Sequence, residues 1–528
     1  MPTTSHCCFL RRSGLVIAMF VVMCSDTSTR AQAPETVTSS EPSSAVASPN
    51  SFSAFPDSSS AIDRASRFGP GQAALTGSGT RQDSVRPGYK LLRYNEDYRF
   101  LRDPGQRTDP WDSLKYIPFG AGDDSFLTLG GEVREWFETY HNSQFGAGPA
   151  NTAGYNALFH QRYMLHADLH LNETFRIFAQ TINGFEDGGI GGPRPDVDVN
   201  RFDLHQGFFD SVWELEDDAR VTWRLGRQEF NYGSGRLIDV REGPNLRRSF
   251  DAGRVLTKLG DWSIDAWWGK PVRNNAGVFD DDPSPQVSFW GAYAVHPIGD
   301  GSTANVDLYY IGYNNDQARF NQKSGHEVRH SIGARLWGRP LPWEYNLEYI
   351  YQFGEFGSGQ ITAWSAANAV RYHFDDLWLK PHPGIRFDIA SGDPSATSNN
   401  LGTFNPMFPS GAYFNLAGPF GPLNIIDLHP TLDLQLTDKL TLTADWNFFW
   451  RENTADGVYA LSGQLIAPGT SGQARFIGSS PSLTWVWSPL PHWTVLASYV
   501  HVFPGEFLKQ ATLGKPIDYV ACWLTYKF

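Results

Sequence analysis

The sequence is poor in cysteine and, beyond its N-terminal end, in long apolar runs. Cys7, Cys8 and Cys24 lie within the first 33 residues, and Cys522 is the only cysteine after them. A single thiol cannot form an intramolecular disulfide. No segment after residue 33 approaches the ~18 consecutive apolar residues that a membrane-spanning helix needs. These absences exclude a disulfide-stabilised scaffold and a bundle of membrane helices.

Lysine and net positive charge are also scarce. The 43 basic residues comprise 33 arginines and 10 lysines, and 56 acidic residues bring the formal net charge to −13. An acidic chain is not expected to bind nucleic acid in general. The motifs G-x-S-x-G, P-loop and G-x-G-x-x-G are missing. No hydrolase or nucleotide site is therefore indicated, and no cofactor is expected.

The first 33 residues have the three parts of an export signal. Arg11 and Arg12 form a positive start, residues 14–24 form an apolar core, and Ala31-Gln32-Ala33 is a cleavage site of the A-x-A type. The apolar core is too short to span a membrane as a helix. We expect residues 1–33 to be removed on export, which limits the mature protein to the periplasm, the outer membrane or the exterior.

Composition divides the rest of the chain into three regions. Residues 34–88 are rich in Ser, Pro, Ala, Gly and Thr without periodicity, which predicts a disordered spacer. Residues 89–124 are more aromatic and contain several arginines, and we expect them to form a periplasmic N-terminal segment. From residue 125 to 528, apolar and polar residues alternate with a period of two, which is typical of β-strands.

The alternating region predicts an all-β fold, a transmembrane antiparallel β-barrel of about 18 strands. One face of each strand is apolar and the other carries charge, as a wall between lipid and water requires. The aromatic content of 14% suits the aromatic girdles of such barrels. The expected strands are 125–140, 157–172, 174–186, 201–215, 220–231, 248–258, 261–273, 287–298, 304–314, 327–338, 343–355, 359–374, 381–391, 424–436, 439–451, 474–488, 492–503 and 518–528.

The connections between these strands alternate in length. Those after even-numbered strands are short, whereas most of those after odd-numbered strands are long, including residues 142–156 and 392–423. Short periplasmic turns and long outer loops give this parity, and a soluble β-sandwich has no reason to produce it. The short connection after the eleventh strand, near residue 357, breaks the parity and makes a strand boundary there suspect. We expect the loop at 392–423 to be surface-exposed and to restrict the pore in part.

Two groups of histidines resemble metal-binding patterns, but in both groups the spacing along a strand is too wide for one metal ion. His326-Glu327-Val328-Arg329-His330 spells H-E-x-x-H, but on a strand the two histidines lie about 13 Å apart. Zinc needs both nitrogens within about 2.1 Å. The histidines at 160, 166 and 170 share one face of the second strand at similarly wide spacing. We expect a pore lining there and no metal.

Arginine is the more informative residue, because its planar fork of donors binds carboxylates in two-point fashion. Inward-facing carboxylates share the same strand faces. The arginines therefore form either a ladder of paired charges that braces a wide lumen or, where unpaired, a path for sugar acids. Strand parity directs these arginines inward: Arg134, Arg162, Arg201, Arg224, Arg329, Arg335, Arg386 and Arg451.

A set of motifs resembles the alginate-export family of outer-membrane barrels. The hallmark is Gly226–Leu237 (GRQEFNYGSGRL) followed by Arg241–Asp251 (REGPNLRRSFD). The resemblance runs from about residue 89 to residue 528. Further blocks match in order: Arg107–Pro110, Leu114–Pro118, Leu129–Glu135, Asp307–Tyr310, Ala390–Asp393 and Phe449–Arg451.

The resemblance implies an 18-stranded barrel with an electropositive, arginine-rich conduit for an anionic polysaccharide. It adds four candidates to the lumen, namely Arg236, Arg241, Arg247 and Arg248. Arg247 and Arg248 are adjacent, so in an extended chain they cannot both face the lumen. We expect one to reach the conduit and the other to brace the loop against a carboxylate such as Asp251 or Glu242.

The leading hypothesis is a passive outer-membrane channel, not an enzyme, that conducts an anionic polysaccharide or sugar-acid solute. Its other expected partners are outer-membrane lipid and, through the alternating C-terminal strand that ends in Phe528, the barrel-assembly machinery. A general small-solute porin on the same scaffold is the first alternative. A barrel enzyme such as a lipase, protease or deacylase, and a structural or adhesive barrel, remain as others.

Overall fold

The computed structural model describes residues 88–120, 124–148, 154–216, 219–299, 303–395 and 397–528. The expected export signal and residues 34–87 of the expected spacer lie outside these ranges. None of the helices in the described ranges has the length and apolar character that crossing a membrane requires.

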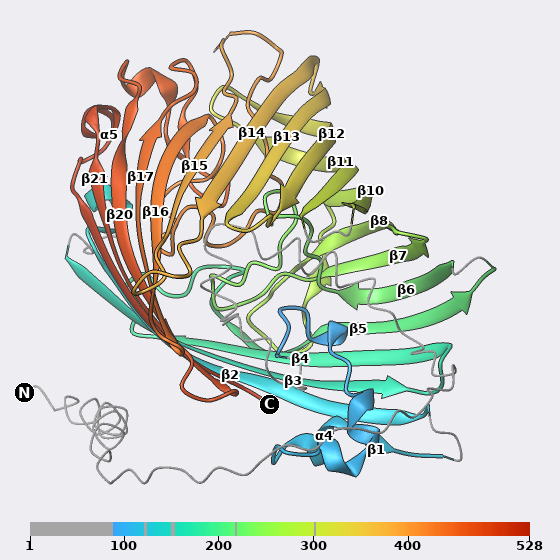
Figure 1. Cartoon of the computed structure of the whole chain (residues 1–528). Helices are drawn as coiled ribbons and strands as arrows, with labels where there is room; N and C mark the ends of the chain where they lie inside the picture. Colours follow the sequence, from blue (N-terminus) through green and yellow to red (C-terminus); the bar gives the residue numbers. More distant parts are fainter. Residues whose placement is uncertain (1–87, 121–123, 149–153, 217–218, 300–302, 396) are drawn as a thin grey trace, which may run out of the picture. The chain divides into compact units, whose positions relative to one another are not determined.

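The described residues form a closed antiparallel barrel of 18 strands (Figure 1), so the predicted fold class is confirmed. Each strand pairs with its neighbour in the chain, and β2 closes the sheet by pairing with both β3 and β22. The strands are β2 (Phe126–His141), β3 (Tyr155–His170), β4 (Phe175–Asp187), β5 (Asn200–Glu214), β6 (Arg220–Gln228), β7 (Phe250–Leu259), β8 (Trp262–Arg273), β10 (Val287–Ile298), β11 (Ala304–Arg319), β12 (Ser324–Gly338), β13 (Trp343–Phe356), β14 (Gly359–Tyr372), β15 (His382–Ala390), β16 (Ile425–Thr437), β17 (Leu440–Trp450), β20 (Phe476–Trp487), β21 (Trp493–Pro504) and β22 (Ile517–Lys527).

Short elements decorate the barrel at its ends and in its loops. Two-residue strands extend the sheet beside β2 and β8, and a small hairpin lies in the loop between β17 and β20. These elements are β1 (Ile117–Pro118), β9 (Asp282–Pro283), β18 (Val458–Tyr459), β19 (Leu465–Ala467), α4 (Asp112–Lys115), α5 (Glu506–Ala511), η1 (Arg93–Asn95), η2 (Arg99–Arg102), η3 (Pro104–Gln106), η4 (Ser143–Gly146) and η5 (Gly469–Ser471).

The two faces of the barrel wall differ as the period of two predicts. On β2, Phe137 points outward and keeps 44% of its surface exposed, whereas Arg134 points inward and is buried. Trp223 and Trp268 also point outward on neighbouring parts of the wall. An apolar outer face avoids the cost of placing polar groups in lipid, while the inner face can pair its charges with one another.

The connections fall into two classes, one at each end of the barrel. At the end where β2 begins, most turns are short, such as the turn at 260–261; we call this the short-turn end. The opposite, long-loop end has two short turns of its own, at 320–323 and 357–358. The suspected boundary error near residue 357 was therefore wrong, because β13 and β14 are joined by a genuine tight turn.

The long loop at 391–424 covers the rim where those two turns are short. Lys323 Nζ donates to the backbone carbonyl oxygens of Ser398 (2.6 Å) and Asn400 (2.7 Å). The backbone N–H of Leu401 donates to Gln360 at 2.9 Å beside the second turn. The short turns thus leave room for a neighbouring loop to cross above them.

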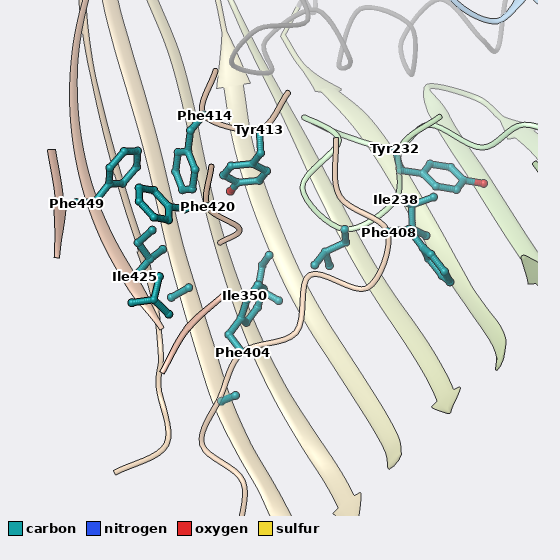
Figure 2. Packing of buried hydrophobic residues seen from close by; sticks show 14 of the residues in the cluster. Tyr232, Ile238, Ile350, Phe404, Phe408, Tyr413, Phe414, Phe420, Ile425 and Phe449 are labelled. Carbon is teal, nitrogen blue, oxygen red and sulfur yellow. The ribbon is translucent and has the colours of Figure 1, made fainter. Parts of the chain in front are cut away.

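Two loops fold into the barrel instead of projecting from it. We call residues 229–249 the arginine loop and residues 391–424 the aromatic loop. Figure 2 shows buried rings of the aromatic loop, among them Phe404, Phe408 and Phe414, packed beside residues of the strands. Burial of one such side chain stabilises a fold by roughly 1.5–3 kcal/mol. Together these rings belong to the largest apolar cluster of the described residues.

The expected strands at 220–231 and 248–258 are too long at the ends that face this interior. β6 ends at Gln228 and β7 begins at Phe250. The chain leaves the wall at Glu229 because the arginine loop turns into the lumen, where Phe230 is fully buried. Alternation alone does not distinguish a strand end from an extended loop that is also buried.

Candidate functional site

The candidate site is the interior of the barrel where the arginine loop and the aromatic loop meet. Ile238 and Phe408 form a parallel β-bridge between the two loops. The backbone N–H of Ser410 donates to Gly235 at 2.8 Å. The two loops therefore form one inward structure. The expectation of a surface loop at 392–423 holds for the exposed Asn400 and is wrong for the buried residues after Gly402, which pack inside.

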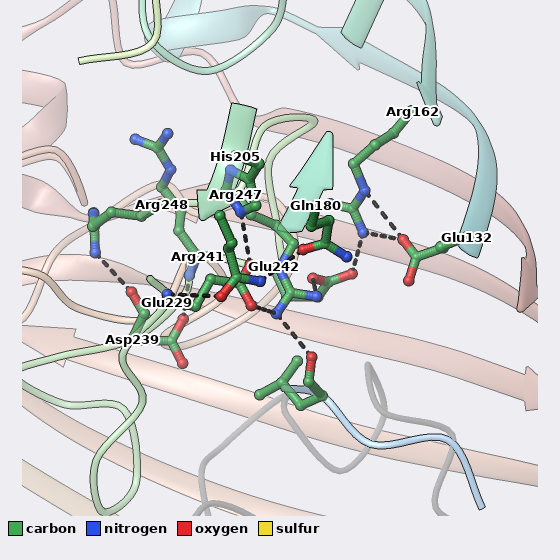
Figure 3. A network of polar contacts seen from close by, with 12 residues as sticks. Glu132, Arg162, Gln180, His205, Glu229, Asp239, Arg241, Glu242, Arg247 and Arg248 are labelled. Atoms are coloured by element: carbon green, nitrogen blue, oxygen red, sulfur yellow. Dashed lines mark hydrogen bonds and ion pairs between the residues drawn. The ribbon is translucent and has the colours of Figure 1, made fainter. Parts of the chain in front are cut away.

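One network of buried charges ties the arginine loop to the wall at β2 and β3 (Figure 3). Arg162 Nη2 lies 2.5 Å from Oε1 of Glu132 on β2 and 2.5 Å from Oε1 of Glu242 in the loop. Arg247 pairs with Glu229 (2.7 Å) and Glu242 (3.2 Å). Charge-assisted hydrogen bonds of this kind are the strong ones, and removing one partner leaves a buried charge uncompensated.

The side chain of Arg134 contacts mainly the backbone of the same loop. Its guanidinium donates to the carbonyl oxygens of Glu242 (2.9 Å) and Pro244 (2.6 Å). It also lies over the rings of Trp136 and Trp523, with 5.2 and 4.8 Å to the ring centroids. These contacts fix the turn of the loop and leave Arg134 buried.

A second network holds the other side of the loop to the wall at β13 and β15. Arg236 lies 2.8 Å from Glu348 and 3.1 Å from Asp388, and it donates to the Tyr413 hydroxyl at 2.9 Å. Arg386 shares Asp388 at 3.0 Å. Because Tyr413 belongs to the aromatic loop, Arg236 joins both inward loops to the wall.

Two further candidates are paired within the wall itself. Arg335 pairs with Asp307 at 2.9 Å, and Arg224 forms a two-point contact with Asp210 at 2.8 Å for each bond. Opposite charges on neighbouring strands stabilise their pairing. Arg335 and Arg224 therefore belong to a ladder of paired charges that braces the lumen, and they are not unpaired arginines along a solute path.

Three candidates have no carboxylate within ion-pair distance among the residues that the structure describes. Arg451 is fully buried, and its guanidinium is surrounded by backbone carbonyl oxygens of residues 454–474, which organise the loop after β17. Arg241 donates to the Asp196 carbonyl at 2.7 Å, and Arg248 donates to the Asp239 carbonyl at 3.1 Å. Arg241 and Arg248 are only half-buried.

The surroundings of Arg241 and Arg248 perturb the protonation equilibria of the loop. Burial, with the neighbouring charge of Arg241, lowers the pKa of Arg248 to about 9. Burial also lowers the pKa of Arg241 to about 10. Both guanidinium groups stay protonated at neutral pH. Burial raises the pKa of Asp239 to about 6, although the Arg241 backbone N–H and the charge of Arg248 oppose this shift.

Sequence reasoning missed part of the site. Glu229 lies inside the barrel, where it pairs with Arg247 and with His205 Nε2 (2.8 Å). It also missed that the N-terminal segment reaches the interior, where Tyr94 is buried. The alternation of β-strands carries no information on either contact, because both depend on chain segments that do not form strands.

The histidines and acidic clusters give little support for a metal. His326 and His330 lie on β12, and each contacts β11, as the strand interpretation predicted. His373, Asp375 and His382 place ligand atoms within 4.8 Å of one another at the short-turn end. Both ring nitrogens of His373 already contact side chains, Arg339 at 3.2 Å and Glu344 at 2.9 Å.

A second group, Asp203, Asp280 and Asp281, is equally compact at the long-loop end. One carboxylate oxygen of Asp203 already accepts the backbone N–H groups of the other two. The group is therefore held together by its own hydrogen bonds.

Comparison with known proteins identifies a matching family for this chain and solved structures with a similar fold. A family model described as "Alginate export" matches residues 125–518. No curated protein matches the sequence. Among solved structures, Pseudomonas aeruginosa OpdK with vanillate has a TM-score of 0.55 at 12% identity, covering 78% of this chain and 100% of that one.

Two other solved barrels are similar to a comparable degree. P. aeruginosa OccK2 (OpdF) in complex with glucuronate has a TM-score of 0.52 at 9% identity, over 78% of this chain and 99% of that one. A BenF-like porin from Pseudomonas fluorescens Pf-5 has a TM-score of 0.52 at 11% identity, over 76% and 98%. At such identities the likeness shows the barrel fold alone.

Proposed function

Because the chain belongs to the alginate-export family of outer-membrane barrels, we propose that it conducts an anionic polysaccharide or sugar-acid solute passively through its arginine-rich interior. The family and the fold are those of an outer-membrane channel of Gram-negative bacteria, not of an enzyme. What the proposal adds is the solute class and the residues that contact it.

The observation that carries the proposal is the pair Arg241 and Arg248. Both lie on the inward-folded arginine loop, both are half-buried, and neither has a carboxylate partner among the described residues. A guanidinium without a protein carboxylate can form a two-point contact with a passing carboxylate. Charged side chains at a constriction set the selectivity of a pore.

The paired arginines have a different role in this proposal. Arg162 and Arg236 anchor the arginine loop to opposite parts of the wall, so the loop is held in place while Arg241 and Arg248 meet the solute. Arg247 braces the loop against Glu242, and its neighbour Arg248 is the solute contact. Preorganised charges act without a cost of rearrangement at the moment of contact.

A second candidate function is a small-solute porin on the same barrel. Two of the similar barrels, OpdK and OccK2 (OpdF), were solved with vanillate and with glucuronate, respectively. In the present barrel the interior is crossed by two loops, which favours a narrow path and is compatible with small anions as well as with an extended polymer. Block by uronate oligomers of increasing length distinguishes the two.

We further propose that the short-turn end and residues 89–124 face the periplasm, with the long loops outside. The apolar outer face then meets lipid, and the C-terminal strand ending in Phe528 is offered to the assembly machinery. An epitope inserted next to the exposed Asn400 tests the orientation. Detection of the epitope on intact cells supports the proposed orientation. Detection only after permeabilisation would mean that the long loops face the periplasm.

The experiment that tests the solute contact is ion selectivity of Arg241→Gln/Arg248→Gln in planar bilayers. A unit charge 4 Å from a passing carboxylate contributes about 1 kcal/mol even in water, a factor of roughly five in relative permeability. We expect the anion-to-cation permeability ratio to fall by about that factor. Arg273→Gln, at the exposed long-loop rim, is the matched control and should leave the ratio unchanged. An unchanged ratio in the double variant refutes the proposed contact.

A further inference from the structure

Residues 89–98 lie at the short-turn end, and Leu92–Tyr94 in their middle are buried inside the barrel. Tyr94 is 3% exposed, and its ring packs edge-on against Phe178 of β4 and Phe208 of β5, with ring centroids 6.0 and 5.4 Å apart. Leu92 belongs to the same buried cluster, as does Val240 of the arginine loop. The segment therefore lies between the inner wall and the loop that carries the proposed solute contacts.

Hydrogen bonds join this segment to both ends of the arginine loop. The Tyr94 hydroxyl donates to the carbonyl oxygen of Glu229, the first residue of the loop, at 2.9 Å. Near the other end, Arg247 Nη2 donates to the Leu91 carbonyl at 2.9 Å. Since Arg247 and Glu229 are themselves paired, residues 91–94 complete a clamp across the base of the loop.

Two arginines of the same part of the wall, on β4 and β6, also contact the segment. Arg224 lies over the Tyr94 ring with 4.4 Å to its centroid, and it lies over Phe208 at 4.0 Å. Arg176 Nη2 donates to the Tyr94 carbonyl at 2.5 Å. Tyr94 is thus held by the wall, by the loop and by two arginines of the lumen.

A separate set of contacts holds the neighbouring residues to the rim. Arg93 donates to the carbonyl oxygens of Gly131 and Phe528 at 2.9 Å each, where the first and last strands of the barrel meet. Trp111 stacks near Phe528 with ring centroids 4.5 Å apart. The segment can lose its contacts inside the lumen while the chain that follows it remains fastened at the rim by Trp111.

We propose that residues 89–98 are an autoinhibitory latch that closes the conduit from the short-turn end and clamps the arginine loop. The space that Leu92 and Tyr94 occupy lies within the interior through which the solute passes. Leu92 and Tyr94 withdraw from Phe178, Phe208 and Val240 when the channel conducts, while Trp111 keeps the chain that follows the latch at the rim. This inference rests on the proposed function only in taking the barrel interior as the solute path.

The first test is KCl conductance of Tyr94→Ala in the full mature chain in planar bilayers. Loss of the ring and its hydroxyl frees the latch, and we expect the mean conductance to rise at least twofold. Tyr155→Ala is the matched control, because Tyr155 is 73% exposed at the long-loop end. It should conduct as the unchanged protein does. Equal conductance of all three proteins, each showing the heat-dependent mobility of a folded barrel, overturns the latch.

The second test reads the latch position directly. Val240 is fully buried beside Leu92 and Tyr94, and Cys522 is the only cysteine among the described residues. In a Cys522→Ser background, Val240→Cys should react slowly with a water-soluble maleimide and at least fivefold faster once Tyr94→Ala is added. Equal rates overturn the latch.

Neither readout uses a polyanion, so the latch and the solute proposal fail separately. If Tyr94→Ala does not raise the conductance, the latch is refuted, but the selectivity test of Arg241 and Arg248 can still support the solute proposal. An unselective channel that still opens in Tyr94→Ala refutes the solute class and supports the latch.

Discussion

The two loops that fill the barrel are held by opposite kinds of interaction. The arginine loop is anchored by ion pairs, such as Arg162 with Glu132 and Glu242. The aromatic loop is anchored by rings, such as Phe408 against Phe250 and Phe289, with centroids 5.2 and 5.4 Å apart. Charge fixes the position of the first loop at the cost of desolvation. The second loop is held mainly by apolar packing, with a few charged donors such as Lys323 and Arg236 bonded to its carbonyl and hydroxyl oxygens.

The difference assigns separate tasks to the two loops. Changes in the arginine loop should alter stability strongly where a charge is paired and selectivity where it is not. Changes in the aromatic loop should alter stability alone. The following predictions separate these effects, and their expected size decreases from the first to the last.

The largest effect is expected from Arg162→Ala. The substitution leaves the carboxylates of Glu132 and Glu242 buried without their shared partner, and breaking a buried pair in this way costs about 3–5 kcal/mol. Denaturant unfolding in detergent micelles measures this loss. Arg273→Ala removes a pair at the exposed rim, which has an ion-pair distance of 3.9 Å, and should change stability by less than about 1 kcal/mol. Similar effects of both variants would contradict the bracing role.

A smaller effect is expected from Phe420→Leu in the aromatic loop, where the ring packs against Phe145 and Phe449 with centroids 5.8 and 5.0 Å apart. Replacement by a smaller apolar side chain leaves a small cavity and should cost roughly 1–2 kcal/mol, below the roughly 3–5 kcal/mol of truncation to alanine. The unfolding midpoint should fall slightly, and the permeability ratio should stay the same because no charge is changed. A change in selectivity without loss of stability would show that the rings, and not the arginines, define the path.

How much of this could be predicted depends on whether a residue lies in a strand. The period of two placed the strand ends within five residues, because the two faces of each strand meet different environments. The largest error is at β11, which ends at Arg319 and not at residue 314. The period also placed Arg134, Arg162 and Arg386 on the inner face, where the structure has them buried. For Arg201 at the start of β5 it was wrong, because Arg201 is exposed and its neighbour Asn200 is buried. The same period could not show that Phe404 and Phe414 are buried. A loop rich in aromatic residues has the same sequence pattern whether it projects outward or folds into the barrel.

The partners of the charges were harder to predict than their direction. The adjacency of Arg247 and Arg248 predicted two different environments, with Asp251 or Glu242 as the brace. In the structure Arg247 pairs with Glu242, whereas Asp251 pairs with Arg227 on β6 at 2.8 Å. Ion pairs between segments distant in the chain depend on how a loop folds, which local spacing does not determine. The role of Arg248 as a solute contact remains a prediction.

The smallest effect is a pH dependence from Asp239. Its pKa is raised to about 6 in the folded protein, above the unfolded value of about 3.9. The folded state therefore gains protons first as pH falls. The stabilising contribution of this group is fully present below the unfolded pKa and is lost as pH rises through about 6.

Protonation of Asp239 also removes a negative charge next to Arg241 and Arg248. We expect the anion-to-cation permeability ratio to rise by less than about twofold between pH 7 and pH 5. Asp239→Asn should abolish this change in the permeability ratio. The control distinguishes the titration of Asp239 from that of Asp281, because burial raises the pKa of Asp281 to about 7. A step that persists in the variant would assign the titration to another group.

The central claim is that unpaired arginines make the interior of an acidic protein select anions. The most direct measurement is the reversal potential of the unmodified channel across a KCl gradient in a planar bilayer. Despite a formal net charge of −13, the account predicts a reversal potential on the chloride side of zero, with block by uronate oligomers. A potential at zero or on the potassium side would contradict the account and assign the barrel to the general porins.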